Sequence, residues 1–100
     1  MDRETISTLV NNAAPELRAR GLGALYLFGS RVREEARDDS DIDIAFDVTE
    51  EANANFSIID QASAQIRLEE IFGRKVDFFE RRALHRRFGD KIDGEMVRLF

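Results

Sequence analysis

Apolar residues recur at helical spacing in several parts of the chain. A first helix is expected over about 5–20, where the apolar positions that would share one face are Ile6, Leu9, Val10, Ala13 and Leu17. Pro15 lies inside this run and predicts a kink or a restart, because proline removes a helix hydrogen bond. A second helix is expected over about 53–72, ending at Gly73, and its predicted buried residues are Ile59, Ala62, Ile66, Leu68 and Phe72.

Strict alternation of acidic and apolar residues over 41–46 is typical of a strand with one polar and one apolar face. Shorter apolar runs predict further strands at 24–28, 75–79 and 96–100. Ser30 is a suitable N-cap for a short helix through about Ala36. A basic helix is expected near 81–88, with a solvated charged face and with Leu84 and Phe88 buried. Helices and strands thus alternate along the chain, which predicts an α/β fold with a small mixed sheet and helices packed against it.

Composition narrows the possible functions. A chain of 100 residues is the size of one domain, so we expect residues 1–100 to form a single unit. No apolar run approaches the length of a membrane span, and the absence of cysteine excludes disulfides and thiolate zinc sites. The net charge of −5 disfavours direct nucleic-acid binding. We therefore expect a cytoplasmic protein without membrane or nucleic-acid contacts.

The acidic residues are unevenly distributed, and they point to a cation site. Residues 31–51 hold nine acidic residues against three arginines. Asp41 and Asp43 stand two apart on the predicted strand, so both side chains point to the same face. Like charges held this close favour binding of a cation, and carboxylate oxygens suit Mg²⁺ or Mn²⁺. Asp77, on a separate predicted strand, is a candidate third ligand.

A second motif lies just upstream, where a predicted strand ends at Gly29 and Ser30. Glycine permits close approach of a ligand to the backbone, and a helix N-terminus offers free N–H groups to phosphate. Arg31 could add a positive charge to the same place. A phosphate-binding turn facing a carboxylate-bound pair of metal ions is suited to in-line attack on a nucleotide phosphorus.

These residues resemble a known family. Gly29-Ser30, ten intervening residues and then Asp41-Ile42-Asp43 are similar to the signature of the DNA polymerase β-like nucleotidyltransferase superfamily, especially its minimal, single-domain (MNT) members. The resemblance implies that Asp41, Asp43 and Asp77 bind metal and that Gly29, Ser30 and Arg31 contact the nucleotide. It further implies transfer of AMP from ATP to a hydroxyl, often a tyrosine, of a partner toxin of the HEPN ribonuclease type, which makes the chain an antitoxin.

Other interpretations stay open at this point. Asp77 could be an ordinary surface acid, and Arg31 could pair with the neighbouring acidic residues rather than with phosphate. Calcium binding is disfavoured, because Ile44 stands where an EF-hand loop needs glycine. His85 has no evident acidic partner in the sequence, and no role is assigned to it. The alternative function is a non-catalytic module of the same fold that neutralises its partner by masking it.

Overall fold

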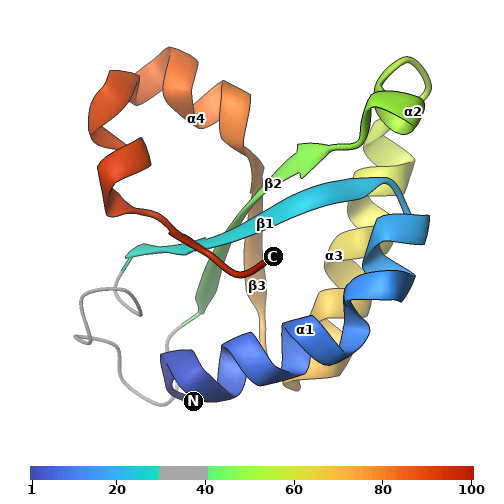
Figure 1. Ribbon diagram of the computed structural model, residues 1–100, viewed down its shortest axis with the longest axis vertical. Coiled ribbons are helices and arrows are strands. Elements are labelled where there is room, and N and C mark those ends of the chain that lie inside the picture. Colours follow the sequence, from blue (N-terminus) through green and yellow to red (C-terminus); the bar gives the residue numbers. More distant parts are fainter. Residues whose placement is uncertain (30–40) are drawn as a thin grey trace.

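The computed structural model describes residues 1–29 and 41–100 (Figure 1). The predicted helix from Ser30 to Ala36 lies outside this range. The helices and strands of the described residues are α1 (Arg3–Ala19), β1 (Leu22–Phe28), β2 (Ile42–Val48), α2 (Glu50–Asn53), α3 (Ile58–Phe72), β3 (Val76–Glu80), α4 (Arg81–Phe88), the 3₁₀ turns η2 (Gly89–Lys91) and η3 (Asp93–Glu95), and β4 (Val97–Arg98).

The four strands form one mixed sheet in the order β3-β2-β1-β4. Strand β1 is antiparallel to both β2 and β4, whereas β2 and β3 run parallel. A parallel pair needs a crossover connection, and α3 supplies it between β2 and β3. The predicted α/β fold with a small mixed sheet is confirmed.

The two faces of the sheet are covered differently. On one face, Ile42, Ile44 and Phe46 of β2 pack with residues of α1 and α3 in the main core. On the other face, Ala45 packs with Leu84 of α4 and with Ile92 in a smaller cluster. In Figure 1, α1 and α3 accordingly lie together on one side of the strands, and α4 lies on the other. The second face is the one that carries the acidic residues of β2.

Local interactions explain where the main helices begin and end. The Asp2 side chain accepts a hydrogen bond from the Thr5 amide at 2.8 Å and caps α1. In α3, Ser57 and Asp60 form a reciprocal capping box, and Gly73 ends the helix with φ of 66°. Of the kink or restart expected at Pro15, the restart does not occur, because α1 runs as one helix from Arg3 to Ala19.

The long helix predicted over 53–72 is divided, and part of its predicted buried face is wrong. The chain forms the short α2 and then begins α3 at Ile58. Leu68 and Phe72 are buried as predicted, and they lie on one helix face with Ala64. Ile59 and Ile66 are instead 75% and 58% exposed, and Ala62 is also exposed. Ile66 and Leu68 stand two residues apart and so project on nearly opposite sides of the helix, where only one side faces the sheet.

Helix α4 begins and ends as predicted, but only part of its apolar surface is buried. Leu84 is buried against the sheet, whereas Phe88 is 54% exposed. Phe88 is the last residue of the helix, and Gly89 then turns the chain away with φ of 72°. Among the described residues, no helix has the length and apolar character needed to cross a membrane.

Candidate active site

The candidate site is centred on the junction between the end of β1 and the start of β2. Asp43 pairs in register with Phe28, so its half-buried side chain stands beside Gly29. Gly29 has φ of 77°, a conformation that favours glycine. A Cβ atom at Gly29 would overlap the Oδ2 atom of Asp43 and would lie 3.1 Å from its Cγ atom. The backbone and the carboxylate therefore approach each other only because residue 29 has no side chain.

Asp77 stands directly across from Asp43 in the parallel register of β2 and β3. Aligned residues on neighbouring strands point to the same face of the sheet, so these two carboxylates are neighbours. The Ile42 amide donates to the Lys75 carbonyl at 3.1 Å and holds this register at the beginning of both strands. Asp41 precedes β2 by one residue and, like Asp77, is exposed to solvent. The two strands thus bring Asp43 and Asp77 together on one face, and Asp41 lies at the same end of the sheet.

The donor set of this face fits Mg²⁺ or Mn²⁺. All three groups are carboxylates, the ligands that hard divalent ions prefer. Their oxygens are not drawn into one tight cluster. Within residues 1–29 and 41–100, a different group of three acidic or histidine side chains has donor atoms that all lie within 4.8 Å of one another. These residues are His85, Asp90 and Asp93. A pair of ions about 4 Å apart needs wider spacing of its ligands than a single ion does.

Two aromatic rings bound the site on the side towards α4. Phe28 and Phe79 come from the strands on either side of β2, and their ring centroids lie 6.0 Å apart with an interplanar angle of 62°. Phe28 is in register with Asp43, and Phe79 is in register with Ala45. The two rings therefore lie across β2, between the carboxylates and the part of the sheet that α4 covers. Sequence reasoning missed this pair, although both residues occupy polar-face positions of their strands.

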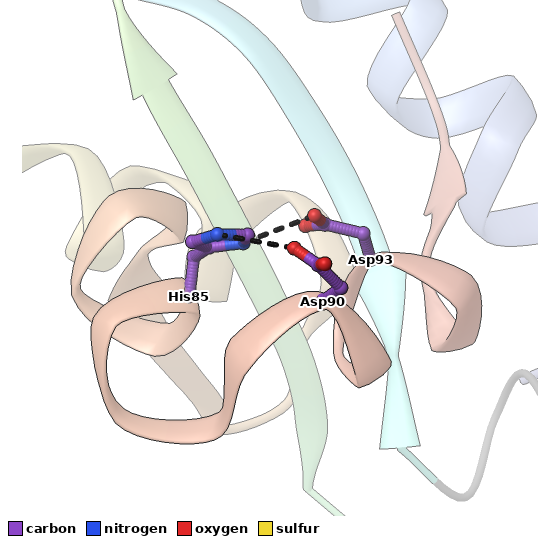
Figure 2. Close-up of side chains that lie close together, drawn as sticks. All are labelled: His85, Asp90 and Asp93. Carbon is purple, nitrogen blue, oxygen red and sulfur yellow. Dashed lines mark hydrogen bonds and ion pairs between the residues drawn. The ribbon is translucent and has the colours of Figure 1, made fainter.

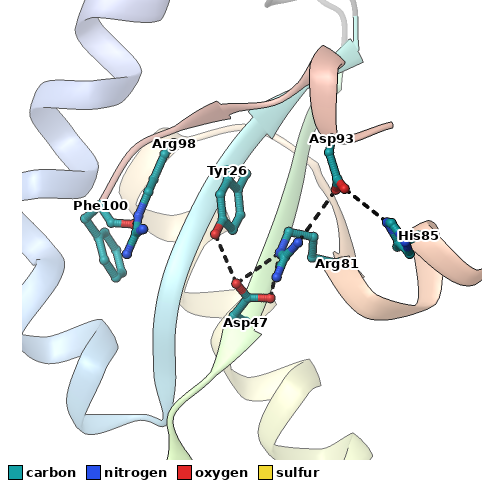
Figure 3. A network of polar contacts seen from close by, with 7 residues as sticks. All are labelled: Tyr26, Asp47, Arg81, His85, Asp93, Arg98 and Phe100. Atoms are coloured by element: carbon teal, nitrogen blue, oxygen red, sulfur yellow. Dashed lines mark hydrogen bonds and ion pairs between the residues drawn. The ribbon is translucent and has the colours of Figure 1, made fainter. Parts of the chain in front are cut away.

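Beyond the aromatic pair, a polar network fastens α4 to the same face of the sheet (Figure 3). Arg81 donates to both oxygens of Asp47, at 2.9 and 3.0 Å, and the Tyr26 hydroxyl donates to Asp47 at 3.0 Å. Burial, and then the hydrogen bond to Asp47, raise the pKa of Tyr26. The hydrogen bond from Arg81 to Asp47 also raises the pKa of Arg81. Asp47 is thus an anchor for α4, rather than part of the open carboxylate face.

This network changes the interpretation of the basic helix. Arg81 was expected on a solvated helix face, but it is half-buried and paired with Asp47. Two acidic side chains also contact His85, for which the sequence indicated none: Asp93 at 3.0 Å and Asp90 at 3.4 Å. These partners lie on the turns that follow α4 and fold back beside it.

The predicted nucleotide ligands Ser30 and Arg31 lie outside the described residues.

Comparison with known proteins identifies the family. The family model for polymerase beta nucleotidyltransferases matches residues 11–100. The chain belongs to the polymerase beta nucleotidyltransferase family. The predicted class of enzyme is therefore confirmed. This nucleotidyltransferase is also 30% identical, over 92 residues, to a candidate protein adenylyltransferase of Methanocaldococcus jannaschii, and the match covers 92% of this chain and 95% of that protein.

Solved structures support the same conclusion about the fold. A structure of a candidate minimal nucleotidyltransferase is 29% identical, with a TM-score of 0.78, and the match covers 97% of this chain and 95% of the other. The match to a chain from a toxin–antitoxin complex with AMP-PNP covers 100% of this nucleotidyltransferase and 73% of that chain, with 21% identity and a TM-score of 0.67. A chain from the complex of a tri-AMPylated Shewanella oneidensis HEPN toxin with its MNT antitoxin matches 94% of this chain and 71% of its own length, with 22% identity and a TM-score of 0.62.

Proposed function

We propose that residues 1–100 act as one minimal nucleotidyltransferase domain that transfers AMP from ATP to a hydroxyl group of a protein. The observation that carries this proposal is the close approach of the Gly29 backbone to the carboxylate of Asp43, a residue that stands in register with Asp77. The relative from Methanocaldococcus jannaschii, a candidate protein adenylyltransferase, supports the choice of AMP and of a protein acceptor.

In this proposal Asp41, Asp43 and Asp77 hold Mg²⁺, or Mn²⁺ in its place. Such ions, when bound, neutralise phosphate charge and stabilise the attacking and leaving oxygens of an in-line displacement. The Gly29 backbone lets the nucleotide phosphates approach, and Ser30 and Arg31 are the proposed ligands of the leaving pyrophosphate. Asp77 takes the proton of the acceptor hydroxyl. The acceptor oxygen forms a bond to the α-phosphorus as the bond between that phosphorus and the pyrophosphate oxygen breaks.

The exposure of the site suits a large acceptor. Asp41 and Asp77 are both open to solvent at the end of the sheet, and α4 covers the neighbouring part of the same face rather than the carboxylates. A hydroxyl on the surface of a folded protein could therefore reach this end of the sheet. Among the structural neighbours, one toxin–antitoxin complex contains AMP-PNP and another contains a tri-AMPylated HEPN toxin. We accordingly propose that the acceptor is a tyrosine of a cognate HEPN-type toxin and that the modification silences that toxin.

The test compares two positions of the label in ATP. The purified protein is incubated with Mg²⁺, a lysate of its source organism and ATP labelled in either the α- or the γ-phosphate. We expect label from α-labelled ATP on a protein band, loss of that label with EDTA or with Asp43→Asn, and no label from γ-labelled ATP. Label from γ-labelled ATP alone would indicate a kinase and contradict the proposal. Label on RNA would keep the chemistry and refute the protein acceptor.

A further inference from the structure

A second group of potential metal ligands lies on α4 and on the two turns that follow it (Figure 2). His85 projects from α4, Asp90 from the turn η2, and Asp93 from the turn η3. One donor atom from each residue can be chosen so that all three lie within 4.8 Å of one another. This group shares no residue with the carboxylates of β2 and β3, so inferences about it do not depend on the proposed function.

The backbone that carries these side chains is held by packing. Leu84 and Ile92 are both buried, and they pack with Ala45 of the sheet. Leu84 directly precedes His85, and Ile92 directly precedes Asp93, so two of the three ligands are neighbours of buried residues. Gly89, with φ of 72°, reverses the chain after α4 and brings η2 back towards the helix. The backbone positions of His85 and Asp93 are therefore set by the fold.

Each ring nitrogen of His85 lies close to a carboxylate oxygen. The Nδ1 atom of His85 lies 3.0 Å from Oδ2 of Asp93, and the Nε2 atom lies 3.4 Å from Oδ1 of Asp90. Asp93 is held from the other side by Arg81, whose NH1 atom lies 3.6 Å from Oδ1.

Charge and ligand chemistry indicate which ion would bind. Asp90 and Asp93 bring two negative charges, and Arg81 contacts both Asp93 and Asp47. Arg82 and Arg86 line the same pocket as His85 and Asp93. One imidazole nitrogen with carboxylate oxygens is a donor set for divalent transition metals, whereas Mg²⁺ favours oxygen ligands alone. A Zn²⁺ ion with tetrahedral coordination holds its donors about 3–4 Å apart, so donor atoms that lie within 4.8 Å of one another have to move closer together only where they exceed that spacing. The Asp90 side chain is 99% exposed and can make that movement at low cost.

From this arrangement we propose that His85, Asp90 and Asp93 bind a divalent transition-metal ion of the Zn²⁺ type. Its binding would link α4 to the two turns that follow it and would leave the carboxylates of the β2–β3 face untouched. The ion here is distinct in chemistry from the Mg²⁺ or Mn²⁺ proposed for catalysis, because that site offers no nitrogen ligand.

His85 is the single histidine of the chain, so its ring resonances report on this site alone. The intact protein, labelled with ¹⁵N and kept in excess Mg²⁺, is titrated with ZnCl₂ while the imidazole signals are followed by NMR. We expect a saturable shift of the His85 ring nitrogens at one equivalent of Zn²⁺. An unchanged ring spectrum with Zn²⁺ in large excess would overturn the proposal and leave the three residues as a set of ion pairs.

Three variants separate this site from general attraction of cations by acidic residues. Calorimetric titration with Zn²⁺ should show about tenfold or greater weakening for Asp90→Asn, and loss of the site for His85→Gln. Glu95→Gln is the matched control, because Glu95 is an exposed acid of the same turn as Asp93 and is not one of the three proposed ligands. It should bind Zn²⁺ as the unaltered protein does. Equal weakening by Glu95→Gln and Asp90→Asn, or unchanged binding by His85→Gln, would refute the assignment. Circular dichroism establishes that each variant is folded.

Discussion

Gly29→Ala is the substitution that probes the candidate active site most closely. The new Cβ atom would overlap Oδ2 of Asp43 and would lie 3.1 Å from Cγ, so the carboxylate or the backbone has to move. The residue must also keep φ near 77°, which costs an L-amino acid about 1–2 kcal/mol. Forcing the Asp43 side chain away from its rotamer adds about 1 kcal/mol. We therefore expect a loss of about 2–3 kcal/mol in the free energy of unfolding.

Gly73→Ala is a matched control for the free-energy cost of holding alanine at a positive φ. Gly73 has φ of 66°, close to that of Gly29, but a Cβ atom there would meet nothing within 4 Å. Its cost should therefore be this backbone cost alone, about 1–2 kcal/mol. Urea denaturation of both variants measures the difference between them, which we expect to be about 1 kcal/mol and which isolates the collision with Asp43.

The effect on catalysis should exceed the effect on stability. Displacing the Asp43 carboxylate by about 1 Å is enough to reduce transfer about 100-fold, because the reacting groups depend on its position. The assay is the rate of AMP transfer from α-labelled ATP under conditions in which both variants are folded. Gly73→Ala should remain within about twofold of the unaltered protein, since a Cβ atom at Gly73 would meet nothing within 4 Å and would displace no carboxylate. Equal activity of the two glycine variants would refute the reasoning.

Two further predictions concern the network and the exposed face of α3. Tyr26 is the single tyrosine, and its pKa is raised by burial and by Asp47, so the folded protein retains the phenol proton more tightly than the unfolded chain. This contribution to stability is present below about pH 10 and is lost as the pH rises through the pKa of the folded state. Ultraviolet titration of the phenol should show a lower pKa in Asp47→Asn, and an unchanged pKa would contradict the role of Asp47. In α3, Ile66→Ala should cost under about 1 kcal/mol of unfolding free energy, because Ile66 is 58% exposed. Leu68→Ala should cost about 3–5 kcal/mol of unfolding free energy, because Leu68 is fully buried. Similar losses for the two variants, measured by urea denaturation, would mean that the face assigned to solvent is covered.

Much of the sheet could be predicted because strand signals are local. Alternation along 41–46 was enough to place Asp41 and Asp43 on one face, and the predicted strands correspond to β1, β2, β3 and β4 with modest changes in their ends. The sequence made Asp77 a candidate partner of Asp43, but it could not establish that the two residues are aligned. Their alignment depends on the register of a parallel pair, which is set by how α3 packs across the sheet rather than by either strand alone.

The incorrect predictions have a common physical cause. Apolar residues occur around much of the circumference of α3, so periodicity alone did not distinguish the face that meets the sheet from the face that meets solvent. Ile59 and Ile66 were therefore assigned to the wrong side. The contacts of Arg81 and His85 were missed for a related reason. Their acidic partners come from a distant strand or from turns whose path no local pattern specifies.

The most direct test of the account is the rate of AMP transfer by Asp43→Asn and Asp77→Asn in a single-turnover assay with α-labelled ATP and Mg²⁺. Glu70→Gln serves as the control, because Glu70 is an exposed acid on α3, the helix that covers the opposite face of the sheet. We expect both aspartate variants to lose transfer by at least about 100-fold while remaining folded, and Glu70→Gln to retain it. Transfer by Asp43→Asn at the rate of the Glu70→Gln control would show that the carboxylate face of β2 and β3 is not the catalytic site.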